Sequence, residues 1–480
     1  MGKVLLIGID GADYNITKKL LDANKLKNLG SISKNGQFSR LISTIPPLSP
    51  TAWTSIFTGV PPYKHGIWGF LKQKDGEYFY KPVTSKDRRV RAIWNVLSEK
   101  NMKSIVVNIP FSYPPERING IMITGLGSPG KDSNFVYPLS LKKFILENFP
   151  NFDVDLNEGK LEEGESIHTL EKDITKTEEH LVDLFLHLLN ENEWDFGAIV
   201  LRSLDIIQHF AFDDKKFVEQ HYKRIDKLIG RILKEAINGS KEEIPVIIAS
   251  DHGFRRVSRR FYVNTWLEKE GYLRLKSNSN ILLKLGIDAE KIRGLMKRMG
   301  FKEIIRKVEH SKFAKQLLKI IPSSSHQYLF DADWSQTKAF FYRGSNGLIK
   351  INVEGREPQG CVNINDVIKL SEEIKSKLEK IVDPITGTKV FKNVFLKWEL
   401  GINSQEYPEI ILLPNEGYEI MDYNINGYLF EDIHNRPGDH DLYGLFMCNF
   451  KHPIKVECVW DIGKLIKSSV LWEASNPATQ

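Results

Sequence analysis

Cysteine is scarce in this sequence, and long apolar runs are absent. Its 480 residues include three cysteines, Cys361, Cys448 and Cys458, which lie far apart and form no CxxC pair. This spacing excludes a disulfide framework and a zinc ribbon, so we expect reduced, buried thiols. A helix that spans a membrane needs about 18 consecutive apolar residues, and the sequence has no such stretch. What is left is a globular protein whose apolar share, 41%, can fill a large core.

A secretory signal peptide is also lacking. The first apolar run, Val4–Ile9, ends at Asp10 and has neither a basic segment before it nor a small-residue cleavage site after it. We expect this run to be a buried strand. A cytoplasmic location follows by default.

The net charge is a mild +6, but one segment is strongly basic. Residues 274–319 contain 13 Lys or Arg against 4 Asp or Glu. Three interpretations of this segment stay open: a solvated helical cap, a funnel that concentrates anionic substrates, and peripheral contact of residues 274–320 with anionic membranes. No motif in the sequence indicates binding of nucleic acid.

Strand and helix patterns alternate along much of the chain. Strands are expected at Val4–Ile9, Ser104–Asn108, Gly197–Leu201 and Val246–Ser250, and helices at Ile16–Leu29, Arg91–Lys100, Glu162–Asn190 and Phe217–Ile237. Such alternation predicts an α/β fold with a mostly parallel central sheet sandwiched by helices.

The expected core is discontinuous. It comprises residues 1–253 and 330–472, because the composition changes after Gly253 and the alternation resumes near Lys338. Residues 254–329 are expected to form a basic helical insertion, or cap, on the sheet. Residues 473–480 form a short tail.

Acidic and histidine side chains gather at or near the ends of expected strands. They are Asp10, Asp205 with His209, Asp251 with His252, and His440. In open α/β sheets ligands bind outside the carboxyl ends of strands, so the first three groups should converge on one edge. A single Asp after a strand is usually a cap or turn residue. The complete set points instead to a chemical site.

Three Asp and three His form a set that suits Zn²⁺, which takes imidazole nitrogen and carboxylate oxygen. Oxygen ligands alone would favour Mg²⁺ or Ca²⁺. So many ligands fit two metals roughly 4 Å apart, which clamp the attacking and leaving oxygens of a phosphoryl transfer. We therefore expect two divalent metal ions, with Zn²⁺ preferred and Mn²⁺ as the alternative.

A hydroxyl-rich segment, Pro46–Gly59, is expected to supply the nucleophile. Ser49-Pro50 has the pattern of an N-cap followed by proline at the first helical position. A hydroxyl there lies at the positive end of the helix, where a phosphate is also favoured. A metal can lower its pKa enough to make it an alkoxide. The simpler alternative is that Ser49 only caps the helix.

These motifs together resemble the alkaline phosphatase superfamily. The resemblance is carried by Asp10-Gly11, the hydroxyl and helix before Thr58-Gly59, His65-Gly66-Ile67, Asp205 with His209, Ser250–Gly253, and His440. Their order is similar to that of the type I phosphodiesterase/nucleotide pyrophosphatase branch, over roughly residues 3–270 and 330–470. Ala52–Ser55, Gln208 and the segment 351–360 are similar to those of a prokaryotic subgroup.

The resemblance assigns roles by position. Relatives place the nucleophile nine residues before the Thr of Thr-Gly and sixteen before the His of His-Gly, and both counts lead to Ser49, with Thr51 as the alternative. It also implies two metal sites. One would be held by Asp10, Ser49, Asp251 and His252, and the other by Asp205, His209 and His440.

Two departures from the family pattern bear on the substrate. Phe70 stands where nucleotide pyrophosphatases carry an Asn that donates to a phosphate oxygen, so Lys72 or Asn108 would supply this contact. Gln208 replaces the Gly before the metal-binding His of relatives. Asp439 and Asp441 flank His440 and are either orienting partners of the ligands or solvated loop carboxylates.

The implied activity is hydrolysis of a phosphodiester or a nucleotide-type pyrophosphate through a phosphoserine intermediate. The substrate would be a phosphorylated small molecule. Two alternatives stay open: a phosphomonoesterase or phosphotransferase/mutase acting on a sugar phosphate, and a non-catalytic phosphate-binding protein. The pattern after Ser49 argues against the sulfatase branch of the superfamily, which has x-Pro-x-Arg there. No pattern indicates the oligomeric state.

Overall fold

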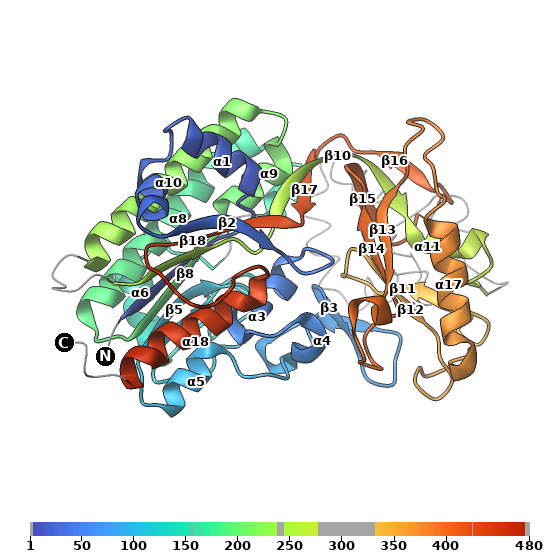
Figure 1. Ribbon diagram of the computed structural model, residues 1–480, viewed down its shortest axis with the longest axis horizontal. Coiled ribbons are helices and arrows are strands. Elements are labelled where there is room, and N and C mark those ends of the chain that lie inside the picture. The colour runs from blue at the N-terminus through green and yellow to red at the C-terminus, as the bar shows by residue number, and fades with distance from the viewer. Residues whose placement is uncertain are drawn as a thin grey trace, which may run out of the picture. The chain divides into compact units, whose positions relative to one another are not determined.

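The structure is a computed structural model (Figure 1) that describes residues 3–154, 156, 158–162, 164–237, 244–276, 332–424 and 426–475. It divides into two compact units. Unit one comprises residues 1–72, 82–257 and 434–480, and unit two comprises residues 73–81 and 258–433. Among the described helices, none is long and apolar enough to cross a membrane.

Unit one is built on an eight-stranded sheet in the order β2-β18-β9-β1-β8-β5-β6-β7. The strands are β1 Val4–Ile9, β2 Gln37–Ile42, β5 Ser104–Ile109, β6 Gly120–Thr124, β7 Val136–Tyr137, β8 Phe196–Leu201, β9 Val246–Ala249 and β18 Tyr443–Cys448. The five central strands from β9 to β6 are parallel, whereas β18 and β7 pair antiparallel with their neighbours. The expected mostly parallel sheet is confirmed.

Helices cover both faces of this sheet (Figure 1). They are α1 Tyr14–Asp22, α2 Lys27–Asn35, α3 Ser49–Thr58, α4 Pro62–His65, α5 Ile93–Glu99, α6 Leu141–Asn148, α7 Glu158–Glu162, α8 Ile167–Glu191, α9 Ser203–Ala211, α10 Lys215–Ile237 and α18 Val459–Ser475, with a 3₁₀ turn at Ser85–Asp87. Successive side chains of β1 point to opposite faces of the sheet. Leu5 and Ile7 pack in the core under α1, α2, α8 and α10, and Val4 and Leu6 in the core under α3, α5 and α18.

The single helix expected at Ile16–Leu29 is two helices in the structure. α1 ends at Asp22, and Asn24 takes a left-handed conformation with φ 56° before α2 begins at Lys27. Asparagine tolerates this conformation better than other side chains do, because its short amide can bond to the local backbone. The apolar periodicity continued through this turn, and the expectation was therefore wrong.

Unit two is antiparallel. Its strands are the second half of β10 Gly253–Tyr262, β11 Ala339–Phe341, β12 Leu348–Ile351, β13 Phe391–Leu396, β14 Ile410–Pro414, β15 Gly417–Met421 and β16 Phe430–Asp432. The hairpin strands β3 Leu71–Gln73 and β4 Tyr80–Pro82 pair with each other at the two ends of residues 73–81. β11, β12, β14 and β13 form one sheet, and β15, β10 and β16 another. The helices are α11 Val263–Lys269 and α17 Val367–Leu378, with 3₁₀ turns at Ile364–Asp366 and Lys397–Leu400.

The observed division differs from the expected one. Residues 330–472 were expected to continue the parallel core, but residues 332–433 belong to unit two and the chain returns to unit one only at His434. The strand patterns after Lys338 belong to antiparallel pairs, which alternation alone does not distinguish from βαβ units. The expected basic insertion lies outside the described residues from residue 277 to its end at 329, and so does most of the possible membrane contact at 274–320. The end of the expected tail, 476–480, also lies outside them.

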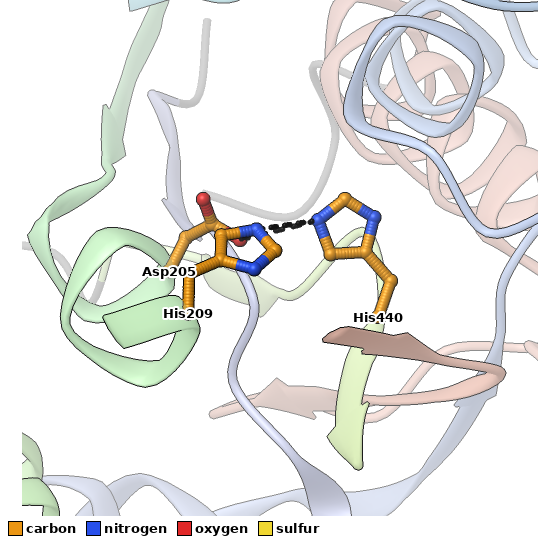
Figure 2. Close-up of side chains that lie close together, drawn as sticks. All are labelled: Asp205, His209 and His440. Carbon is orange, nitrogen blue, oxygen red and sulfur yellow. Dashed lines mark hydrogen bonds and ion pairs between the residues drawn. The ribbon is translucent and has the colours of Figure 1, made fainter. Parts of the chain in front are cut away.

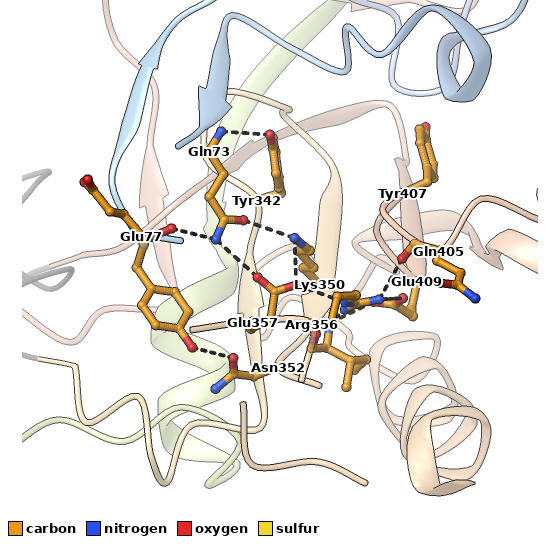
Figure 3. Close-up of polar contacts among 12 residues, drawn as sticks. Gln73, Glu77, Tyr342, Lys350, Asn352, Arg356, Glu357, Gln405, Tyr407 and Glu409 are labelled. Carbon is orange, nitrogen blue, oxygen red and sulfur yellow. Dashed lines mark hydrogen bonds and ion pairs between the residues drawn. The ribbon is translucent and has the colours of Figure 1, made fainter. Parts of the chain in front are cut away.

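Residues 351–360, the segment that resembles one of a prokaryotic subgroup, form a turn held by buried charges within unit two (Figure 3). Arg356 donates to Glu409 Oε1 at 2.7 Å, and Lys350 Nζ lies 2.7 Å from Glu357 Oε1. Gln73 Nε2 donates to Glu357 Oε2 at 3.2 Å. Because each buried charge has an opposite partner, this network fixes the turn without leaving an uncompensated ion.

Candidate active site

The acidic and histidine side chains predicted from the sequence gather at one edge of the unit-one sheet. Asp10 follows β1, the Asp251–His252 pair follows β9, and α9, which carries Asp205 and His209, begins two residues after β8. Since β1 is parallel to both β8 and β9, these three strands end at the same edge. They therefore bring five side chains together.

His440 reaches the same place by strand pairing. It lies in β17 Gly438–Asp441, which pairs antiparallel with the first half of β10. In this register His440 stands opposite Phe254, two residues beyond His252. The pairing spans nearly two hundred residues of chain. It delivers the sixth predicted side chain to the cluster.

Asp205, His209 and His440 form one group of side chains (Figure 2) that could hold a metal ion. Asp205 Oδ1 lies 3.5 Å from Nε2 of each histidine. The two Nε2 atoms lie 3.1 Å apart. All three side chains are buried, so a cation between them would lie in a site of low water content.

Asp10, Asp251, His252 and Ser49 form the neighbouring group. His252 Nε2 lies 3.5 Å from Asp10 Oδ1 and 3.2 Å from Asp251 Oδ2. Ser49 Oγ lies 3.4 Å from Asp10 Oδ1 and 3.2 Å from His252 Nε2. Asp205 connects the two groups, because its Oδ1 is 4.0 Å from His252 Nε2. The geometry thus gathers the seven side chains that the sequence suggested as ligands.

Each histidine of the cluster places Nδ1 beside a main-chain carbonyl oxygen. The pairs are His209 with Gly438 at 2.9 Å, His252 with Gly253 at 3.1 Å, and His440 with Pro47 at 2.8 Å. A carbonyl oxygen only accepts, so Nδ1 carries the proton in each ring. Burial lowers the pKa of all three imidazoles, for His252 to about 4. At neutral pH each ring therefore directs an Nε2 lone pair into the cluster, as a metal ligand does.

The carboxylates need a positive charge between them. Burial raises the pKa of Asp10 and Asp251, and the other carboxylates of the cluster raise it further. Asp251 Oδ1 accepts from Gly11 N at 3.2 Å, while Oδ2 accepts no hydrogen bond from the described residues. A divalent cation would compensate these charges and use the open oxygen. The mixture of imidazole nitrogen and carboxylate oxygen suits Zn²⁺ or a similar transition metal.

Ser49 is not the N-cap that the sequence suggested. The N-cap of α3 is Leu48, and Ser49 is the first helical residue. Its hydroxyl contacts Asp10 and His252 instead of a helical N–H group, and only 3% of the residue is exposed. The interpretation of Ser49 as a mere cap is therefore wrong. Thr51 is also buried, but its hydroxyl has no hydrogen-bond partner among the described residues.

Four further predicted residues have partners outside the cluster. Lys72 Nζ lies 3.5 Å from Asp87, and Asn108 Nδ2 donates to Val200 O at 2.7 Å. Asp439 Oδ2 lies 3.3 Å from Arg255, which also donates to His440 O at 2.9 Å. Asp441 stands opposite Gly253 in the β10–β17 register. Contact of Lys72 or Asn108 with substrate stays a prediction, as does an orienting role of Asp439 or Asp441.

Three residues to which the sequence assigned no contact with the site support the cluster. Trp53 Nε1 donates to Asp10 Oδ2 at 3.2 Å, and Arg202 Nε lies 3.6 Å from the same oxygen. Gln208 Nε2 donates to Gly11 O at 2.7 Å. The position of Trp53 could have been predicted from the sequence. It lies four residues after Ser49, so one helical turn places both side chains on the same side of α3.

Phe70, at the position where relatives carry Asn, packs against an aromatic ring. Its ring lies edge-on to Phe111, with centroids 5.5 Å apart. Phe111 has a left-handed backbone with φ 57° and follows β5 at the same edge of the sheet as the cluster. A phenyl ring donates no hydrogen bond to a phosphate oxygen, so Phe70 does not supply such a contact.

Comparisons with known proteins agree with this fold. A phosphonoacetate hydrolase from Sinorhizobium meliloti in complex with phosphonoformate superposes with a TM-score of 0.59, at 14% identity over 98% of this chain and 96% of that one. Human ectonucleotide pyrophosphatase/phosphodiesterase 5 gives a TM-score of 0.54 at 14% identity, over 98% and 95% of the chains. An inactive murine form in complex with AMP gives 0.54 at 13% identity, with the same coverage.

The sequence itself identifies the family. A search of curated proteins gave no match. The profile described as Type I phosphodiesterase / nucleotide pyrophosphatase, however, matches residues 4–441, which include every side chain of the cluster. The chain therefore belongs to the type I phosphodiesterase/nucleotide pyrophosphatase family of phosphoester hydrolases.

Proposed function

We propose that this protein hydrolyses a phosphodiester or a nucleotide-type pyrophosphate bond, with Ser49 as the nucleophile. The observation that carries the proposal is the position of the Ser49 hydroxyl. It lies within 3.4 Å of both Asp10 and His252, at the edge of a buried cluster of carboxylates and imidazoles. A serine with only a structural role has no need of such neighbours.

The cluster would hold two divalent metal ions, for which Zn²⁺ is the first choice and Mn²⁺ the second. Asp10, Ser49, Asp251 and His252 would hold one, and Asp205, His209 and His440 the other. When bound, the pair supplies charge neutralisation at the phosphoryl group and lowers the pKa of hydroxyl groups beside it. The open Oδ2 of Asp251 and the three converging Nε2 atoms support this assignment.

Ser49 is the first residue of α3, so its hydroxyl lies at the positive end of the helix dipole, which favours an anionic phosphoryl group there. The hydroxyl gives up its proton, and Oγ forms a bond to phosphorus in line with the leaving oxygen. That oxygen departs and takes up a proton. Water then attacks phosphorus and breaks its bond to Oγ, which takes up a proton again, and the remaining phosphate monoester is released. Positioning and charge stabilisation supply most of the catalysis in such transfers.

The substrate is proposed to be a phosphorylated small molecule. The murine relative is in complex with AMP and the Sinorhizobium relative with phosphonoformate, both small phosphorus-containing anions. One observation favours a second candidate, a phosphomonoesterase or phosphotransferase acting on a sugar phosphate. Phe70 stands where diester-cleaving relatives have an amide donor, and it packs on Phe111 instead.

Substitution of the two candidate nucleophiles tests the mechanism. Ser49→Ala should reduce kcat by several orders of magnitude while the bound metal, measured by elemental analysis, stays near the wild-type content. Thr51→Val is the matched control, because it removes the neighbouring buried hydroxyl and should retain most activity. If Ser49→Ala stays active and Thr51→Val does not, the nucleophile is Thr51. If both stay active, the covalent route is wrong.

A pair of chromogenic substrates separates the two candidate functions. Bis-(nitrophenyl) phosphate and nitrophenyl phosphate share a leaving group and differ in the number of ester bonds. A diesterase should show the higher kcat/KM for the first, and a monoesterase for the second. If neither substrate nor a panel of nucleotides is hydrolysed with Zn²⁺ or Mn²⁺ present, the non-catalytic phosphate-binding alternative is favoured.

A further inference from the structure

The two oxygens of Asp10 face different neighbours. Oδ1 lies 3.4 Å from Ser49 Oγ and 3.5 Å from His252 Nε2, on the side of the cluster. Oδ2 accepts a hydrogen bond from Trp53 Nε1 at 3.2 Å and lies 3.6 Å from Arg202 Nε. Asp10 is completely buried, so water does not compete for either oxygen. One oxygen of the carboxylate thus faces the cluster, and the other faces the Trp53 N–H donor and the positive charge of Arg202.

Gly8 leaves space for the indole ring of Trp53. Trp53 lies on α3 and is completely buried in the core between α3, α5 and α18 and the sheet. Gly8 of β1 lies directly beside it, because a Cβ at this position would stand 2.4 Å from the end of the indole ring. Any side chain larger than hydrogen at Gly8 would push the ring away. The absence of a Cβ at Gly8 therefore leaves room for the indole in the position from which its nitrogen donates to Asp10.

We infer that Trp53 is a positioning residue, which orients Asp10 so that Oδ1 alone faces the metal site of Asp10, Asp251 and His252. The inference rests on the proposed function, because it concerns the same metal-binding cluster. Asp and Glu ligands can rotate and bind through either oxygen or through both. A hydrogen bond from Trp53 to Oδ2 removes that freedom, and the ionic contact with Arg202 acts in the same direction. Partners of this kind typically contribute 10- to 100-fold to metal affinity.

Trp53→Phe tests the inference, because it keeps an aromatic ring and removes the N–H donor. Trp94→Phe is a matched control. Trp94 lies on α5 in the same core, is equally buried, and donates its indole N–H to another carboxylate, Glu116, at 2.7 Å. Both variants would be stripped of metal with a chelator and titrated with Zn²⁺ against a chromogenic competitor, so that two stepwise Kd values are obtained without turnover.

We expect Trp53→Phe to raise one of the two Kd values by about 10- to 100-fold and to leave the other unchanged. Trp94→Phe should leave both unchanged even though it loses similar packing. In protein loaded with Co²⁺, the visible spectrum of the affected site should change in Trp53→Phe and not in Trp94→Phe. Gly8→Ala would place a Cβ 2.4 Å from the indole ring and 2.9 Å from Val200 Cγ2, so it should also weaken the same site.

Two results would overturn the inference about Trp53. One leaves the proposed function intact, and the other rejects the proposed function as well. Zinc affinities of Trp53→Phe that match those of Trp94→Phe, in a wild-type protein that binds two zinc ions, would reject the role of Trp53 and leave the proposed function standing. A wild-type protein that binds no divalent cation would reject both.

Discussion

Nε2 of His209 lies 3.1 Å from Nε2 of His440. Because Nδ1 of each ring faces a carbonyl oxygen, neither Nε2 carries the proton, and two lone pairs oppose each other across this distance. Such a contact is repulsive unless a cation lies beside it. Two imidazoles on one tetrahedral zinc, with Zn–N bonds of about 2.05 Å, place their nitrogens about 3.3 Å apart. The arrangement of the two rings is thus close to that of a ligand pair.

The first prediction follows from this pair: divalent metal should stabilise the folded protein. A ligand that binds only the folded state at 100 times its Kd stabilises by about 2.7 kcal/mol. Zn²⁺ added to chelator-treated protein should therefore raise the Tm in a differential scanning experiment. His440→Ala should bind one metal fewer per chain and lose part of this increase.

His180→Ala is the control for that experiment. His180 lies on α8 and contacts Asp183, away from the cluster. Its variant should keep the wild-type metal content and the full response to Zn²⁺. If chelation and re-addition of metal leave the Tm of the wild-type protein unchanged, the cluster does not bind these ions.

The second prediction concerns acid stability. His221 on α10 is buried, and its Nδ1 has no hydrogen-bond partner among the described residues. Burial, with Arg224 nearby, lowers its pKa to about 4, against the small opposing effect of Glu178. An unfolded chain has a histidine pKa of about 6.5, so it binds more protons than the folded chain between pH 6.5 and 4. His221 should therefore reduce stability as the pH falls through this window.

The expected size is about 3 kcal/mol between pH 7.5 and pH 4, since one pKa unit corresponds to about 1.4 kcal/mol. Urea unfolding of the wild type and of His221→Phe, with chelator present, would measure it. Phenylalanine keeps the ring contact with Phe217 and does not titrate. The free energy of unfolding should depend less on pH in the variant. Equal slopes in the two proteins would show that His221 titrates normally in the folded state.

Much of the site could be predicted because parallel strands end at the same edge. Asp10, Asp205 and the Asp251–His252 pair each follow a continuous apolar run, and the topology alone brings such residues together. His440 was named as a candidate because Gly438–Asp441 stands just before an apolar run, but its convergence with the other residues could not be predicted from the sequence. Its place depends on the pairing of β17 with β10, and no local pattern specifies a partner so far along the chain.

The errors share a physical cause, which is that local patterns do not determine distant contacts. Ser49 has a good N-cap sequence, but the cap falls on Leu48 because the hydroxyl is engaged by Asp10 and His252. Asn24 interrupts an otherwise continuous helical periodicity. Residues 332–433 have strand patterns that fit either a parallel or an antiparallel sheet, and only the long-range pairing decides between them.

The last prediction concerns Glu178, a buried carboxylate that holds the turn between β8 and α9. Its Oε1 accepts the N–H groups of Arg202 and Ser203 at 2.7 and 2.8 Å. Its Oε2 accepts from the Ser203 hydroxyl at 2.5 Å and from Arg224 at 2.8 Å. Asp205 lies two residues beyond this turn. Glu178 thus fixes the start of the helix that carries two of the candidate ligands.

Glu178→Gln retains the shape of the side chain but turns an N–H₂ group toward groups that themselves donate hydrogen bonds. It also removes the buried negative charge that faces Arg224. We expect a loss of about 3–5 kcal/mol, the usual cost of breaking a buried ion pair. Glu179→Gln is the matched control, since Glu179 is the next residue on α8 and contacts the same Arg224 at 3.4 Å, but is half exposed. An exposed pair of this kind contributes less than about 1 kcal/mol.

Urea unfolding of both variants, with and without Zn²⁺, would measure the difference. Equal stabilities would mean that the β8–α9 turn is held by its backbone alone, and the metal affinity of Glu178→Gln would then match that of the wild type.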